Sequence, residues 1–158
     1  MYPLKGWIIG SQLSEHIHNT SSPNNIIKFK SKFDGGLFNE MHFYSRYCTR
    51  NKLEEYKNLR KISYLGIPEL IDHGVNHEFR FIVIPKYVNI ERELNCNDYS
   101  QLVDSLEFIH SRGYSHRYIN LPISLELQTR LYLLILKPFQ SLQIKTRVMI
   151  LLVLTLVQ

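Results

Sequence analysis

Segments with a strand pattern and segments with a helical pattern alternate along the first 111 residues, and this order constrains the fold most. Runs of β-branched and aromatic residues bounded by Gly, Ser, Pro and Asn indicate short strands at residues 7–9 and 25–30. The polar residues 10–24 between them are expected to form a connector. From Leu37 to Cys48, apolar residues recur at spacings of three and four, which predicts an amphipathic helix.

The next part of the chain repeats both patterns. Residues 53–60 have helical spacing with charged residues at the polar positions, which predicts a second helix. Residues 68–74 and 78–85 are typical of two strands joined by a turn at residues 74–77. These two segments therefore predict a hairpin.

A third helix is expected at residues 97–111, where apolar residues recur at helical spacing and Asp98 or Ser100 is available as the N-cap. The sequence therefore predicts an α+β fold. A small antiparallel sheet within residues 7–85 is packed by the helix that begins near Leu37, and a mostly helical portion follows.

The composition changes abruptly after Asn120. Residues 121–158 contain twelve leucines, one acidic residue and no glycine, whereas all seven glycines lie earlier. We therefore divide the chain into a folded domain of residues 1–120 and an atypical leucine-rich tail of residues 121–158. Two explanations of the tail stay open: an aberrant or frameshifted end to the reading frame, or an apolar segment that docks on a partner or on the preceding lobe.

Charge and hydropathy exclude several classes of protein. The formal net charge is +5, but residues 1–120 carry 15 basic and 13 acidic side chains, so nucleic-acid binding is not expected. The late apolar run at residues 148–157 is shorter than the roughly 20 residues of a membrane-spanning helix, and no secretory leader is visible. Cys48 and Cys96 lie far apart, outside any metal-binding spacing. These features favour a cytoplasmic protein without a membrane span.

Five short motifs, taken in order, resemble the vaccinia-related kinases, a family of the casein-kinase-1-like protein kinase superfamily. They are residues 26–30, 35–40, 64–68, 79–84 and 106–116. The opening at Trp7 to Gly10 is similar to poxvirus members in particular. The resemblance covers residues 7–120 and implies a kinase-like N-lobe followed by the start of a helical C-lobe.

The resemblance also implies a vestigial nucleotide site. In the family, a strand lysine contacts the phosphates and a helix glutamate holds it; Lys28 and Glu40 match these positions. We expect the two side chains to lie within about 4 Å of each other. The alternative is a surface lysine and an unrelated helix acid. Ile84, Pro85 and Tyr87 match the family's hinge and complete the site.

The catalytic loop departs from the family, which has the pattern His-Gly-Asp-Ile-Lys and an asparagine shortly after. Here His116 is kept, but Tyr118 replaces the aspartate that accepts the proton, Asn120 replaces the lysine and Ile123 replaces the asparagine that binds magnesium. A phenol with an ordinary pKa of about 10 cannot act as a carboxylate base near neutral pH. Residues 121–158 contain no aspartate, so the family's second magnesium ligand has no counterpart there.

The segment that matches the family's glycine-rich loop is also degenerate. Residues 10–18 contain one glycine and the acidic Glu15, so no close phosphate contact is expected. His16 and His18 have no further ligand nearby, so we interpret them as loop residues and predict no metal site. ATP and magnesium are the family's cofactors, and we assign neither to this chain. Reduced nucleotide binding through Lys28 stays open as an alternative.

The sequence therefore predicts a truncated pseudokinase, because 158 residues is fewer than the roughly 250 of a complete two-lobed kinase. Such a protein is catalytically inactive and acts, if at all, by binding a partner protein, such as a related kinase or its substrate. Two alternatives stay open. One is a weakly active or ancestral ATP-dependent serine/threonine protein kinase, which would need an unconventional base and metal site. The other is a nonfunctional fragment of a kinase gene.

Overall fold

The structure is a computed structural model that describes residues 4–86, 95–115, 124–127, 130–133 and 140–141. The chain divides into two units. The first contains residues 1–54 and 68–86, and the second contains residues 55–67 and 87–158. Of the helices in the described ranges, none is long and apolar enough to span a membrane.

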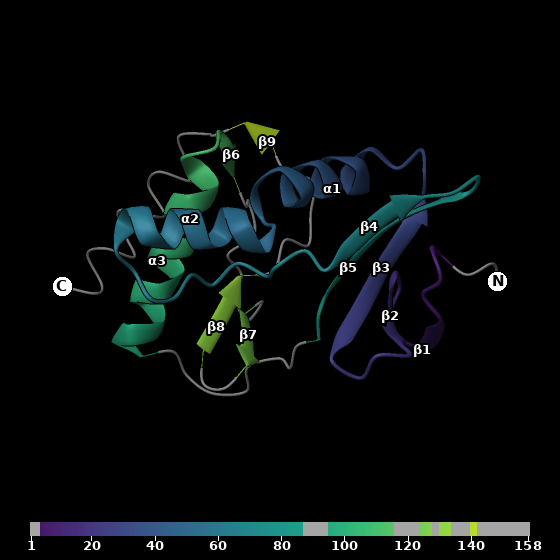
Figure 1. The fold of residues 1–158 in the computed structure, drawn as a ribbon, viewed down its shortest axis with the longest axis horizontal. Helices are drawn as coiled ribbons and strands as arrows, with labels where there is room; N and C mark the ends of the chain where they lie inside the picture. The colour runs from purple at the N-terminus through teal and green to yellow at the C-terminus, as the bar shows by residue number, and fades with distance from the viewer. Residues whose placement is uncertain (1–3, 87–94, 116–123, 128–129, 134–139, 142–158) are drawn as a thin grey trace. The chain divides into compact units, whose positions relative to one another are not determined.

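A five-stranded antiparallel sheet forms the first unit (Figure 1). Its spatial order is β1 (Ile9–Ser14), β2 (Ile17–Thr20), β3 (Asn25–Ser31), β5 (Phe79–Pro85) and β4 (Asp72–Val75). The longest pairing joins β3 to β5 along their full lengths. The predicted antiparallel sheet is confirmed, and so is the hairpin, although its first strand begins only at Asp72.

The expectation that residues 10–24 form a connector is wrong, because they contain most of β1 and all of β2. Nearly every side chain of β1 is exposed. An edge strand of this kind lacks the alternation of apolar and polar residues that identifies a half-buried strand in a sequence. Its pairing with β2 is also irregular, with register shifts on both sides of Gln12.

One face of the sheet carries a hydrophobic core. Because side chains alternate along a strand, residues two apart share a face. The buried members of this core are Leu4, Ile27, Phe29, Phe81 and Val83. Leu4 comes from the N-terminal segment, which is fixed to β4 through Asp72: this carboxylate accepts hydrogen bonds from Lys5 Nζ at 2.9 Å and Trp7 Nε1 at 2.7 Å.

Helix α1 (Gly35–Tyr47) packs on the opposite face, and α2 (Arg50–Arg60) follows it. Both helices were predicted, and each begins two or three residues before its first apolar position. Asp34 caps α1: its Oδ1 accepts a hydrogen bond from the Leu37 backbone N–H at 2.9 Å. The buried residues of α1 recur at helical spacing and face the sheet.

Helix α3 (Cys96–His110) is the main element of the second unit. Its N-cap is Asn95 rather than Asp98 or Ser100. Asn95 Oδ1 accepts from the Asp98 N–H at 2.9 Å, and Asp98 Oδ2 accepts from the Asn95 N–H at 2.8 Å. This reciprocal capping box places Asp98 in the first turn.

Helix α3 confirms the helical start that was expected after the sheet, and short strands that were not predicted follow it. Strand β6 (Tyr114–Ser115) pairs with β9 (Gln140–Ser141), and β7 (Ser124–Leu127) pairs with β8 (Arg130–Leu133). Within this unit, Tyr56 and Phe108 pack edge to face with ring centres 4.8 Å apart. The fold is therefore α+β, with an antiparallel sheet and the capped helix α1 in its first unit.

Candidate functional site

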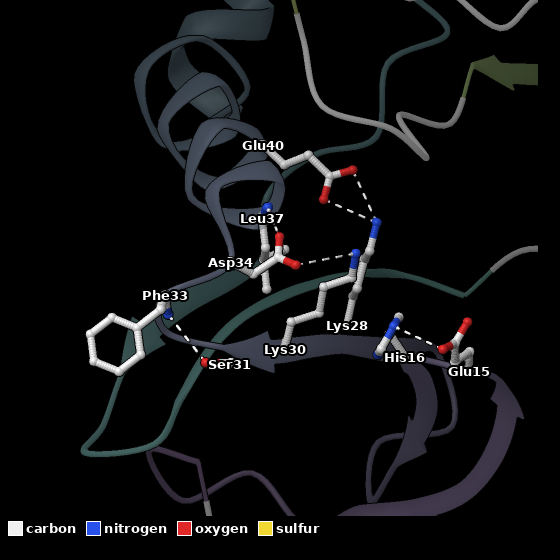
Figure 2. Close-up of polar contacts among 9 residues, drawn as sticks. All are labelled: Glu15, His16, Lys28, Lys30, Ser31, Phe33, Asp34, Leu37 and Glu40. Carbon is white, nitrogen blue, oxygen red and sulfur yellow. Dashed lines mark hydrogen bonds and ion pairs between the residues drawn. The ribbon is translucent and has the colours of Figure 1, made fainter.

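Strand β3 and helix α1 bring Lys28 and Glu40 together (Figure 2). Lys28 Nζ lies 3.0 Å from both carboxylate oxygens of Glu40. Lys28 is 8% exposed and Glu40 is 2% exposed, which is rare for charged residues unless they are paired. The predicted approach of these two residues is confirmed. The alternative of a surface lysine and an unrelated helix acid does not fit a buried pair.

Local structure explains why these two side chains meet. Lys28 lies opposite Ile82 in the β3–β5 register, so both project from the face that α1 covers. Glu40 lies three residues after Leu37 and four before Tyr44, on the buried stripe of α1. Because Asp34 fixes where the helix begins, Glu40 falls in its second turn, beside the strand.

Burial dominates the electrostatics of the pair. Burial raises the pKa of Glu40, and the Lys28 ammonium opposes that rise through its charge and its hydrogen bond. Such a pair compensates the cost of removing two charges from water only when its geometry is good, as the two 3.0 Å contacts are here. An ammonium has three N–H donors, so Lys28 keeps one for a third acceptor, such as a phosphate oxygen.

A second ion pair joins the same strand and helix. Lys30 Nζ lies 3.9 Å from Asp34 Oδ2, at the start of α1. The hydrogen bond from the Leu37 N–H lowers the pKa of Asp34, and the nearby Lys30 charge lowers it further. Sequence reasoning missed both residues. An aspartate directly before the helical pattern is the N-cap signal that identifies Asp34.

Curated proteins with similar sequences are protein kinases. The B1 kinase of variola virus is 27% identical over 130 residues, which cover 70% of this chain and 43% of that protein. The serine/threonine-protein kinase VRK1 of Caenorhabditis elegans is 27% identical over 136 residues, covering 71% of this chain and 22% of VRK1. These kinases are homologues of the chain. The chain thus spans less than half the length of the curated relatives it matches.

One more sequence relative and one solved structure are similar to the chain. A probable serine/threonine-protein kinase of fowlpox virus is 29% identical over 134 residues, covering 70% of this chain and 44% of that kinase. The solved structure of vaccinia related kinase 3 has a TM-score of 0.64 at 23% identity, covering 80% of this chain and 46% of that one. No protein-family model matches the chain.

The hinge positions suggested by the vaccinia-related kinases lie at the end of β5. Ile84 is buried opposite Ile26, so it shares the sheet face of Lys28. Pro85 is half-buried, opposite Asn25. Tyr87 lies outside the described residues, as do His116, Tyr118, Asn120 and Ile123 of the catalytic loop. Nucleotide binding by Lys28, Glu40, Ile84, Pro85 and Tyr87 stays a prediction.

The segment that corresponds to the glycine-rich loop of the vaccinia-related kinases forms the β1–β2 hairpin. A Cβ at Gly10 would lie 3.2 Å from the Asn19 carbonyl oxygen, so glycine lets these two strands approach closely. The His18 ring packs against Phe29, with ring centres 5.0 Å apart. Across the described ranges, no three His, Cys, Asp or Glu residues are grouped so that they could hold a metal ion.

Proposed function

We propose that the chain is a kinase-like protein that does not transfer phosphate and that acts by binding a protein partner. The observation that carries the proposal is the loop sequence, in which Tyr118 replaces the carboxylate base of the kinase family. Asn120 and Ile123 replace the residues that offset phosphate charge and bind magnesium. Proton acceptance and metal placement act as a unit in such a site, so their joint loss removes the reaction.

The packed elements of the first unit support a binding role. Its first unit has the complete five-stranded sheet, a capped α1 and the buried Lys28–Glu40 pair. The substituted loop residues belong to the chemical step and not to these packed elements. A lobe that folds without catalytic groups still presents a defined surface to another protein. A related kinase or a substrate of one is the partner class we propose.

One observation favours a second candidate, a weakly active serine/threonine protein kinase. Phosphoryl transfer in protein kinases requires the lysine–glutamate pair to be in place, and Lys28 and Glu40 are in contact. This candidate needs a base other than Tyr118 and a magnesium site built from other residues.

Nucleotide binding with and without magnesium separates the two candidates. The melting temperature of the full chain is measured with ATP alone, with ATP and magnesium, and with magnesium alone. We expect magnesium to add no stabilisation beyond that of ATP, because the family's metal ligands are replaced. The weak kinase instead predicts an added, concentration-dependent rise with magnesium and ATP. The double variant Lys28→Met/Glu40→Leu removes both charges of the pair and is the matched control.

A further inference from the structure

Two aromatic side chains at the start of α1 face solvent. Phe33 is 85% exposed and Phe38 is 41% exposed, and every other Phe, Tyr or Trp within residues 4–86 and 95–114 is buried or half-buried. Phe33 precedes the N-cap and Phe38 is the fourth helical residue, positions that pack together in a hydrophobic staple. Here the Phe33 ring extends away from Lys28 and Glu40 (Figure 2), and the Phe38 ring instead packs against His42, with ring centres 5.0 Å apart.

Each exposed ring has a cation over one face. Lys32 Nζ lies 5.2 Å from the centre of the Phe33 ring, and Arg80 Cζ lies 4.8 Å from the centre of the Phe38 ring. Among the residues that the structure describes, Arg80 Nη1 donates only to the Met41 sulfur at 3.6 Å, a weak acceptor, and Arg80 Nε is buried without a hydrogen-bond partner. Within the described part of the chain, neither cation has a carboxylate within 4 Å. Four other cations of this unit each have one: Lys5, Lys28, Lys30 and Arg50.

The strand register also places Arg80 beside another cation. Arg80 lies directly opposite Lys30, and like charges in that position repel each other. Lys30 is compensated by Asp34, whereas the partners of the Arg80 guanidinium within the described ranges are the Phe38 ring and the Met41 sulfur. Glu78 is exposed nearby, but its backbone carbonyl, not its carboxylate, accepts from Lys32 N–H at 2.9 Å. Carboxylates of another molecule would compensate the charges of Lys32 and Arg80.

We propose that Lys32, Phe33, Phe38 and Arg80, here named the aromatic corner, bind an acidic segment of a partner protein that carries an apolar side chain. The apolar side chain would cover the exposed rings, and flanking carboxylates would pair with Lys32 and Arg80. The proposal rests on the proposed binding function and adds the class of partner. A nucleic-acid backbone fits less well, because nucleic-acid binding rests on neutralising many phosphates and the described residues of this surface offer only two cations without a carboxylate.

The test is a titration of the isotopically labelled full chain, followed by backbone amide chemical shifts. The probe is a synthetic peptide with tryptophan and leucine flanked on each side by two glutamates. We expect saturable shifts at residues 32–38 and at Arg80. Phe33→Ser should weaken binding by about fivefold or more, because an exposed ring loses its apolar contact. Arg80→Gln should weaken binding of the peptide similarly. The Phe33→Ser protein should still fold, because the Phe33 ring is exposed.

Matched controls use exposed residues of the same unit that lie outside the corner. Leu13→Ser removes an exposed apolar side chain and Lys52→Gln removes an exposed cation, and both should bind the peptide as the natural chain does. A peptide with lysines for the glutamates should not bind, and neither should an oligouridylate of about ten nucleotides. The proposal is overturned if no saturable shift appears, if the control variants lose as much affinity, or if the lysine peptide or the oligonucleotide binds equally well. Phosphate transfer by the chain would contradict its inactivity but would leave this titration unchanged.

Discussion

At the scale of single residues, the buried Lys28–Glu40 pair should stabilise the first unit only as a pair. Lys28→Met and Glu40→Leu should each lower the free energy of unfolding by about 3 kcal/mol or more, because each leaves one buried charge without its partner. The double variant should be closer to the natural chain than either single variant. Urea denaturation of all four proteins measures the coupling. Independent, additive losses would contradict a tightly paired site.

The same pair predicts a dependence on pH. Burial raises the pKa of Glu40 above its ordinary value of 4.5, so the folded state binds that proton more tightly than the unfolded state. Burial of the ionised Glu40 carboxylate therefore lowers the free energy of unfolding at pH values above the folded-state pKa. This loss of stability is relieved as the pH falls through that pKa toward 4.5. Without the Lys28 charge the pKa should rise further. The stability gap between Lys28→Met and the natural chain should thus narrow from pH 7.5 to pH 5, and a constant gap would exclude this explanation.

Asp34 should act on α1 mainly as a cap. Asp34→Ala should lower the free energy of unfolding by about 1 kcal/mol, because the Leu37 N–H loses its acceptor. Asp34→Ser keeps an acceptor and should cost only a few tenths. Since the folded-state pKa of Asp34 is lowered, its contribution is present above pH 3.8 and is lost as the pH falls through that lowered pKa. Hydrogen exchange of the first-turn amides of α1 measures the effect, and equal losses in the two variants would contradict capping.

Some residues of the site could be predicted from the sequence, and others could not. Lys28 and Glu40 could be predicted because the motifs that contain them match a family position by position. Lys30 lies in a matched motif but Asp34 does not, and their contact depends on how the chain turns from β3 into α1. Phe33 and Phe38 are apolar residues, which a sequence reading places in a core. Their exposure depends on how α1 sits on the sheet.

At the scale of elements, the close approach of β4 to β5 should require glycine at one position. A Cβ at Gly74 would lie 2.7 Å from Phe81 Cε1, and Phe81 is 1% exposed within the core. Gly74→Ala should therefore lower the free energy of unfolding by about 1–3 kcal/mol. Gly35→Ala at the first residue of α1 is the matched control, because a Cβ there has no heavy atom within 4 Å. Thermal and urea unfolding of both variants test this, and equal effects would contradict steric exclusion at Gly74.

Elements with a strong apolar period were predicted well, and those without one were not. Strand β3 and helices α1, α2 and α3 bury a recurring set of side chains, so their periods are visible in the sequence. Strand β1 is a polar edge strand that is held by pairing with β2. That pairing depends on backbone hydrogen bonds, which any residue type except proline can make. Composition alone therefore could not distinguish this hairpin from a connector.

At the scale of the whole molecule, the chain is similar to vaccinia-related kinases in sequence and in fold, whereas the residues of its loop depart from the pattern of that family. Alternating strand and helix patterns predicted the α+β architecture, and five motifs in order implied a kinase-like lobe. The likeness to vaccinia related kinase 3 agrees in fold. The short strands β7, β8 and β9 were not predicted, because residues 121–158 lack the glycines that usually mark turns. The division of the chain at Asn120 stays a prediction.

Radiolabelled phosphate transfer tests the central claim most directly. The purified full chain is incubated with labelled ATP and with magnesium or manganese, and incorporation into itself and into added acceptor proteins is compared with that of Lys28→Met/Glu40→Leu. We predict equal background incorporation for both proteins, and also for Tyr118→Asp, since one restored carboxylate does not rebuild the magnesium site. Incorporation by the natural chain that persists through repurification and is lost in the double variant would contradict the claim and establish a weak kinase.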